Sequence, residues 1–199
     1  MIEAIFYINL DERTDRRKEV EQEMEGMGLP FERFAGIKTT PGIIGCGIAH
    51  CGVIKEARRR GYKNVLVVED DFMFLVDKET FRSELEAAIQ EVPDYDVLML
   101  GYSMKQSQPF SDRLLRVIEA QAGSAYLVNA KMYDSLIAIW EFGNQKILEK
   151  MEHWLYANDQ VWKRIQPSSQ WYAFSRRIGK QRPSIGDTSY APAWAEYDC

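Results

Sequence analysis

The apolar positions near the N-terminus follow first a strand pattern and then a helix pattern. Residues 2–10 are mostly apolar without strict alternation, which predicts a strand buried on both faces, as in a parallel sheet covered by helices. Val20, Met24 and Met27 then recur at helical spacing until a Gly-Leu-Pro segment interrupts the pattern. A short strand is expected over residues 31–34. The chain therefore opens as strand, loop, helix and strand.

The next stretch has the most informative pattern. Small and apolar side chains fall four residues apart over residues 46–60, which predicts a second helix. Residues 64–68 form a continuous, β-branched apolar run that ends abruptly in Glu69, Asp70 and Asp71. This pattern is typical of a central parallel strand with acids at its carboxyl end.

Helices and strands keep alternating in the second half of the chain. In chain order, we expect a helix over residues 81–89, a strand over 96–101, a polar loop over 104–112, strands over 114–119 and 125–128, and a helix over 132–140. From residue 166 onward, Ser, Pro, Gly and aromatic residues predict a loop-rich tail. Such alternation predicts an α/β sandwich with a mostly parallel central sheet and ligands beyond the carboxyl ends of its strands.

Composition narrows the class of protein. A length of 199 residues fits a single domain, and no apolar tract is long enough to cross a bilayer. The formal net charge of -5 argues against a nucleic-acid partner, which would demand a basic face. The first strand has no basic leader, and the three cysteines lack the paired spacing of a zinc site. We therefore expect a cytoplasmic protein with reduced thiols and no transmembrane segment.

The three consecutive acids suggest a cation site. They would repel one another at a strand end unless a cation or a hydrogen-bond network compensated their charge. Because alternate residues of an extended chain point the same way, Glu69 and Asp71 could hold one Mn²⁺ or Mg²⁺ ion. Asp70 would then turn aside or contact a ribose hydroxyl. The alternative is that these acids cap a following helix or lie in solvent.

Three stretches resemble motifs of glycosyltransferase family 25, which includes lipopolysaccharide and collagen galactosyltransferases. Residues 9–17, Asn-Leu-Asp-Glu-Arg-Thr-Asp-Arg-Arg, resemble its Asn-Leu-Asp-x-Arg-x-x-Arg opening. Residues 45–50 resemble its Gly-Cys-x-x-Ser-His helix start, with Ala49 in place of the serine. Residues 67–71 resemble its apolar strand followed by Glu-Asp-Asp. The resemblance covers residues 2–140 well and the remainder poorly.

The resemblance implies a GT-A type of fold, a UDP-sugar donor, Mn²⁺ dependence and inversion at the anomeric carbon. The expected enzyme transfers a hexose, galactose or glucose, to a hydroxyl of a glycan, glycolipid or glycoprotein, as in lipopolysaccharide biosynthesis. Its donor half would span about residues 1–103 and its acceptor half about residues 104–199 of one domain.

The same resemblance suggests donor-binding residues. Asn9 and Asp11 follow the first strand, where nucleotides lie in parallel sheets, and could bind a uracil or ribose. Arg13 and Arg16 could meet a phosphate through their guanidinium groups. His50 could donate to a phosphate or ribose, although a core or capping histidine is an open alternative.

Inverting transfer needs a carboxylate that removes the acceptor proton. Asp159 is the candidate base, since it follows aromatic residues that could stack on a sugar, and Asp187 is the second choice for base or metal ligand. The aromatic residues that could form an acceptor platform, or simply pack in the core, are Tyr102, Trp154, Trp171 and Tyr172.

Two other functions stay open at the level of sequence. A metal-dependent nucleotidyltransferase would use similar acids and a similar sheet, although no Gly-rich phosphate loop followed by lysine is present. A non-catalytic nucleotide- or sugar-binding module would keep the fold without turnover. Ala49 and the poorly matching tail keep this last alternative open.

Overall fold

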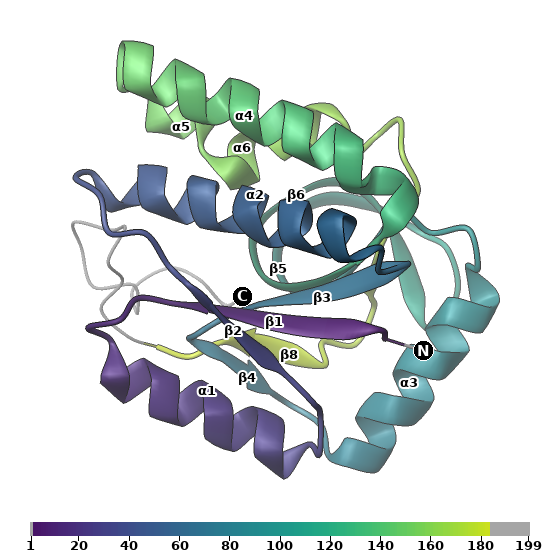
Figure 1. Ribbon diagram of the computed structural model, residues 1–199. Coiled ribbons are helices and arrows are strands. Elements are labelled where there is room, and N and C mark those ends of the chain that lie inside the picture. Colours follow the sequence, from purple (N-terminus) through teal and green to yellow (C-terminus); the bar gives the residue numbers. More distant parts are fainter. Residues whose placement is uncertain (1, 184–199) are drawn as a thin grey trace.

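A computed structural model describes residues 2–183 and shows an α/β fold built on a six-stranded sheet of order β2-β1-β3-β6-β5-β7 (Figure 1). Its strands are β1 (Ala4–Asn9), β2 (Glu32–Ala35), β3 (Asn64–Glu69), β5 (Val97–Pro109), β6 (Leu114–Asn129) and β7 (Trp171–Phe174). A separate two-stranded sheet pairs β4 (Phe72–Phe74) with β8 (Gly179–Gln181).

Helices cover both faces of the large sheet. They are α1 (Thr14–Gly26), α2 (Gly42–Arg60), α3 (Lys78–Glu91), α4 (Tyr133–Lys150), and the one-turn α5 (His153–Tyr156) and α6 (Asn158–Val161). Single 3₁₀ turns lie at Ala130–Met132 and Trp162–Arg164. Figure 1 shows α2 and α4 on one face and α1 and α3 on the other. The three layers are those that the alternating pattern predicts.

The sheet is mostly parallel, as expected. β1 pairs in parallel with both β2 and β3, and β5 pairs in parallel with β7. Only β6, which is antiparallel to β3, β5 and β7, runs the other way. The ends of β1 and β3 therefore lie side by side, with Ile8 opposite Glu69.

Side-chain alternation in β3 divides the core between the two faces. Val65 and Val67 belong to the apolar cluster beneath α2 and α4, whereas Leu66 and Val68 belong to the cluster that includes residues of α1 and α3. All four are fully buried. A strand buried on both faces has no room for a charge along its length, so its acids come at the end.

Some sequence predictions for the second half were wrong. Residues 104–112 were expected to be a loop, but β5 continues to Pro109, and β6 is one strand where two were expected. β5 and β6 form a long, curled pair (Figure 1) with several register shifts. Lys105, Gln106 and Gln108 are exposed there, so the apolar pattern that reveals a strand is missing.

The tail from residue 166 is also more regular than expected. It contributes β7, whose four residues are all buried, and β8. Within residues 2–183, no helix is long and apolar enough to span a membrane.

Candidate functional site

The ends of β1 and β3 bring together residues that are far apart in the sequence. Asn9, the last residue of β1, donates from Nδ2 to Asp70 Oδ2 at 2.8 Å. Arg16, in the first turns of α1, donates to Asp70 Oδ1 at 3.0 Å. All three residues are buried. Both carboxylate oxygens of Asp70 are therefore held by protein groups, and burial raises the pKa of Asp70 despite these two partners.

Asp71 differs from Asp70 in its hydrogen bonding. Its Oδ2 lies 3.3 Å from the Arg16 guanidinium, whereas its buried Oδ1 has no hydrogen-bond partner among residues 2–183. Burial and the nearby charge of Glu69 raise the pKa of Asp71 to about 7. A buried carboxylate oxygen without a donor is costly unless a proton or a cation meets it. The residue therefore fits a hard-cation site.

Glu69 points to the opposite side of the sheet, toward α2. Its Oε1 lies 3.0 Å from His50 Nε2, and its Oε2 accepts from Gln181 Nε2 at 3.0 Å. The other ring nitrogen of His50, Nδ1, lies 2.6 Å from the Tyr126 hydroxyl. Burial raises the pKa of Tyr126 far above its usual value, so its hydroxyl keeps its proton. Opposite the Glu69 carboxylate, which only accepts, His50 donates from Nε2, and its Nδ1 accepts a hydrogen bond from the Tyr126 hydroxyl.

Cys46 completes this side of the site. Its thiol and the ligand atoms of His50 and Glu69 all lie within 4.8 Å of one another. Burial raises the pKa of the thiol, and the charges of Glu69, Asp159, Asp71 and Asp70 raise it further. The thiol is therefore not an activated nucleophile in the protein alone.

Asp159 joins the site from a distant part of the chain. It lies in the first turn of α6, where its Oδ2 accepts from the Ala122 backbone amide at 3.1 Å and its Oδ1 accepts from Gln160 at 3.2 Å. Burial raises the pKa of Asp159, and the charge of Glu69 adds to this rise. The candidate base therefore lies close enough to Glu69 for the charge of Glu69 to raise its pKa.

Other predicted site residues lie at the rim or outside the described region. Asp11 is largely exposed and pairs with Arg33, and Arg13 pairs with exposed Asp15 at 3.0 Å. Asp187 lies outside residues 2–183. Of the aromatic residues weighed as an acceptor platform, Tyr102, Trp171 and Tyr172 are core residues, whereas Trp154 is 60% exposed.

The structure adds residues that sequence reasoning missed. Arg33 of β2 donates to Asn9 Oδ1 at 3.1 Å and to the Asn9 carbonyl at 3.0 Å, which fixes the end of β1. Tyr126 and Gln181 orient His50 and Glu69. For Arg33, the available signal was its place in a short strand expected beside the first one. Residues 125–128 and Gln181 match weaker motifs of the family resemblance, but these matches assign no role in the site to Tyr126 or Gln181.

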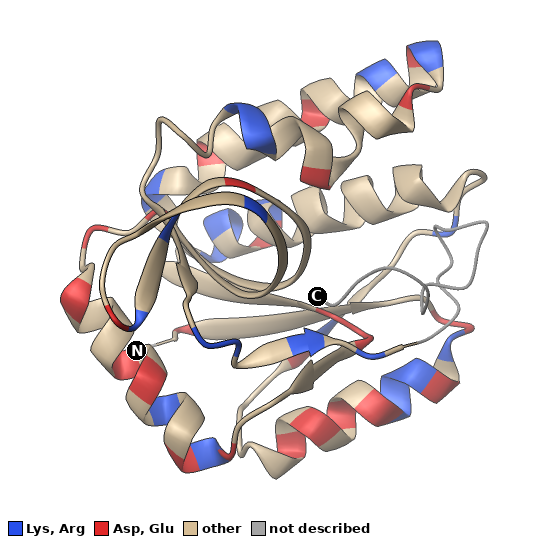
Figure 2. Ribbon diagram, turned by 180° about the vertical axis from the view of Figure 1, so that it is seen from behind, with Lys and Arg blue, Asp and Glu red and all other residues tan. Residues whose placement is uncertain are grey.

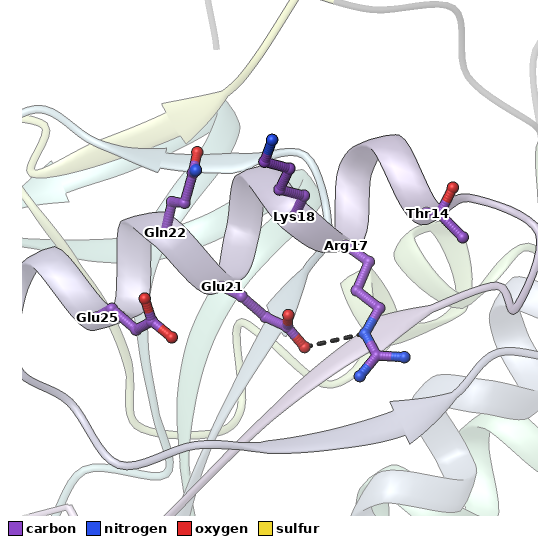
Figure 3. A pocket seen from close by; sticks show the side chains of 6 residues that line it. All are labelled: Thr14, Arg17, Lys18, Glu21, Gln22 and Glu25. Atoms are coloured by element: carbon purple, nitrogen blue, oxygen red, sulfur yellow. Dashed lines mark hydrogen bonds and ion pairs between the residues drawn. The ribbon is translucent and has the colours of Figure 1, made fainter.

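A shallow surface depression lies elsewhere, along α1 (Figure 3). Its lining residues are Thr14, Arg17, Lys18, Glu21, Gln22 and Glu25. Arg17 donates to Glu21 at 3.0 Å, the contact drawn in Figure 3. Most of these side chains are exposed, so this depression is a solvated helix surface, separate from the acids of β3.

Known proteins support the family resemblance. No protein-family model matches the chain. A glycosyltransferase 25 family member of Drosophila pseudoobscura pseudoobscura is 25% identical, over 71% of this chain and 29% of its own length. The chain is a relative of glycosyltransferase 25 proteins. Procollagen galactosyltransferase 1 of Danio rerio is 28% identical, over 52% of this chain and 22% of its own length. The chain thus spans under a third of these glycosyltransferase 25 relatives.

Solved structures share the fold. A UDP-glucose pyrophosphorylase complexed with UDP-glucose matches with a TM-score of 0.55 and 8% identity, covering 88% of this chain and 91% of the other. The glycosyltransferase GlyE of Streptococcus pneumoniae TIGR4 matches with a TM-score of 0.54 and 8% identity, covering 99% of this chain and 57% of the other. The chain therefore has a GT-A-like fold.

Proposed function

We propose that this chain is a glycosyltransferase that transfers a hexose, galactose or glucose, from a UDP-sugar to a hydroxyl of a glycan, glycolipid or glycoprotein. The main support for the proposal is the buried Oδ1 of Asp71, which has no hydrogen-bond partner among residues 2–183. This oxygen lies beside Glu69 and Asp70 at the end of a central strand. The sequence relatives named as glycosyltransferases give this cluster its chemical context.

In this proposal Glu69 and Asp71 hold a hard cation, Mn²⁺ or Mg²⁺. Carboxylate oxygens are the ligands such ions prefer. Burial, and then the charge of Glu69, raise the pKa of Asp71 to about 7, and a bound cation would offset both effects. When bound, the ion would supply neutralising charge for the diphosphate that departs with the donor.

The donor nucleotide would lie over the ends of β1 and β3, within the proposed donor half of residues 1–103. Asn9 and Asp70 form the floor, and Arg16 holds the two aspartates of the site in place. Asp11 and Arg13 stand at the rim, where an exposed carboxylate and guanidinium could reach the ribose and a phosphate. His50 is proposed to act on the donor from the α2 side.

The acceptor half, residues 104–199, would supply the base. Asp159 is the proposed group that takes the acceptor hydroxyl proton during inverting transfer. Burial and nearby acids raise its pKa, which makes its carboxylate a stronger base. Asp187 stays the second choice.

The test is a screen of UDP-sugars for Mn²⁺-dependent UDP release, with and without simple glycoside acceptors. We expect release with one hexose donor and a loss of release in Asp71→Asn. Asp134→Asn is the matched control, because Asp134 is exposed and pairs only with Arg58 on the outside of the molecule. Equal activity of Asp71→Asn and wild type would overturn the proposal.

The same assay separates the alternatives. A nucleotidyltransferase would release pyrophosphate from UTP and a sugar phosphate. The fold that the chain shares with a UDP-glucose pyrophosphorylase is the reason to measure pyrophosphate release as well. Nucleotide binding without any turnover, across all donors, would identify a non-catalytic module.

A further inference from the structure

The first turns of α2 present two metal-ligating side chain types to the end of β3. Cys46 and His50 are four residues apart and therefore lie on one face of the helix, one turn from each other. Glu69 faces them from the sheet, and the ligand atoms of the three residues lie within 4.8 Å of one another. Sulfur, imidazole nitrogen and carboxylate oxygen thus meet at one place.

Close packing on both sides of Cys46 fixes this part of α2. A Cβ at Gly45 would lie 1.8 Å from the Ile37 carbonyl oxygen, and a Cβ at Gly47 would lie 2.3 Å from Asn144 Oδ1. Only glycine allows the approach of Gly45 to the backbone, whereas a side chain at Gly47 would require Asn144 to shift. The helix is therefore seated against the preceding loop and against α4, and the position of Cys46 is determined by that packing.

Two further contacts orient the other ligand atoms. The Tyr126 hydroxyl lies 2.6 Å from His50 Nδ1, which leaves Nε2 directed at the cluster. When a cation binds Nε2, the ring proton resides on Nδ1 and is donated to the Tyr126 oxygen, and the Cys46 thiol releases its proton to solvent. Gln181 Nε2 holds Glu69 Oε2 at 3.0 Å. Metal-ligating histidines and carboxylates commonly have such supporting partners, which fix the ring and the carboxylate before the ion binds.

The charge around the cluster favours a cation. Four carboxyl groups, of Glu69, Asp159, Asp71 and Asp70, act on the Cys46 thiol. Among residues 2–183, no Lys or Arg forms an ion pair with Glu69, and residues 42–54 of α2 carry no charge. Figure 2 shows the same contrast between the uncharged start of α2 and the densely charged α1. The negative potential is therefore not neutralised from the α2 side.

We propose that Cys46, His50 and Glu69 form a site for a borderline-soft divalent cation such as Zn²⁺. Bonds of about 2.0–2.3 Å to one S, one N and one O ligand place tetrahedral ligand atoms roughly 3.3–3.8 Å apart. The 3.0 Å pair of His50 Nε2 and Glu69 Oε1 would open slightly, and pairs that involve Cys46, which lie within 4.8 Å, would contract by about 1 Å at most. Three protein ligands leave a fourth position open. The site shares Glu69 with the proposed hard-cation site and differs from it in its thiol and imidazole. Zn²⁺ binding needs neither donor nor acceptor, so it does not depend on the proposed transferase activity.

Cobalt titration of the intact chain tests the proposal directly, because Co²⁺ takes zinc sites and a bound thiolate gives it a charge-transfer absorption. We expect a one-to-one Co²⁺ complex with this absorption, displaced by Zn²⁺. Cys46→Ser removes the absorption, and both Cys46→Ser and His50→Gln weaken Zn²⁺ binding by about 100-fold or more, beyond the usual effect of a supporting contact.

Two other cysteines serve as matched controls. Cys51→Ser changes a buried cysteine five residues further along the same helix, outside the cluster, and Cys199→Ser changes the cysteine outside residues 2–183. Both should leave the absorption and the affinity unchanged. Circular dichroism confirms the fold of each variant. No thiolate absorption in the wild type, or an absorption that survives Cys46→Ser, would overturn the assignment.

Discussion

The acidic end of β3 has two unlike sides. Toward α1, Asp70 and Asp71 face the guanidinium of Arg16 at 3.0 and 3.3 Å. Toward α2, Glu69 meets His50 and Gln181, and no Lys or Arg forms an ion pair with it among residues 2–183. The protein therefore supplies its own cation on one side and only hydrogen-bonding groups on the other.

This difference supports the proposed position of an external cation. Buried carboxylates need compensation by a charge or by hydrogen bonds, and Arg16 provides it for Asp70 but incompletely for Asp71. Among residues 2–183, Asp71 Oδ1 has no hydrogen-bond partner, and we propose that it and Glu69 bind a cation that is not part of the chain. Substitutions that alter one of the two sides at a time test this difference.

The largest effect is expected on the α2 side, in Asp159→Asn. If Asp159 is the base, acceptor-dependent turnover should fall by about 10²- to 10⁴-fold, the usual value of a positioned proton acceptor. Donor binding should persist, because the amide keeps the size of the side chain. Steady-state UDP release and donor titration measure the two quantities, with Asp134→Asn as control. Turnover near that of the wild type would exclude this role.

On the α1 side, Arg16→Met tests the positive charge that the Arg16 guanidinium supplies to Asp70 and Asp71. It leaves two buried carboxylates without their positive partner, so the free energy of unfolding should fall by about 3–5 kcal/mol. Arg58→Met is the control, since the exposed pair of Arg58 with Asp134 should contribute less than about 1 kcal/mol. Urea denaturation measures both. Equal losses in the two variants would contradict the contrast between the sides.

The dependence of stability on pH tests the incomplete compensation of Asp71. Its pKa is raised to about 7, so the folded state holds this proton more tightly than the unfolded chain. The contribution to stability is therefore full below the usual pKa of 3.8 and is lost as pH rises toward about 7, by a few kcal/mol at most.

Asp71→Asn has no proton to lose, so it should flatten this slope in metal-free protein. Urea denaturation in the presence of EDTA over this pH range provides the measurement. An unchanged slope would show that Asp71 is not the group responsible.

The smallest effect is expected from Tyr126→Phe, which removes the hydroxyl beside His50. Stability should fall by about 1 kcal/mol, and Zn²⁺ affinity by about tenfold, because the imidazole loses its orienting partner. Tyr102→Phe is the matched control: its hydroxyl donates to the Phe174 carbonyl at 2.5 Å, away from the cluster. It should cost similar stability without changing Zn²⁺ affinity. Equal Zn²⁺ affinity in both variants would contradict the orienting role.

Sequence patterns predicted the elements whose buried side chains form a regular apolar pattern along the chain. The apolar run over residues 64–68 became β3, with the three acids at its end, and the N-terminal pattern became β1, α1 and β2. The polar half of β5 was missed because its side chains meet solvent, and pairing with β6, which lies later in the chain, makes it a strand. β7 was missed because four buried residues in a Ser- and Pro-rich tail show no period.

The sequence by itself determined which chemical groups come at the end of a buried strand, because burial imposes local patterns along the chain. Only the tertiary structure decided what each group meets. Asp70 meets Asn9 across 61 residues and Arg16 across 54, while Glu69 meets Gln181 across 112. Strand pairing and helix packing create these neighbours, and burial among them raises the pKa of Asp70 and of Asp71.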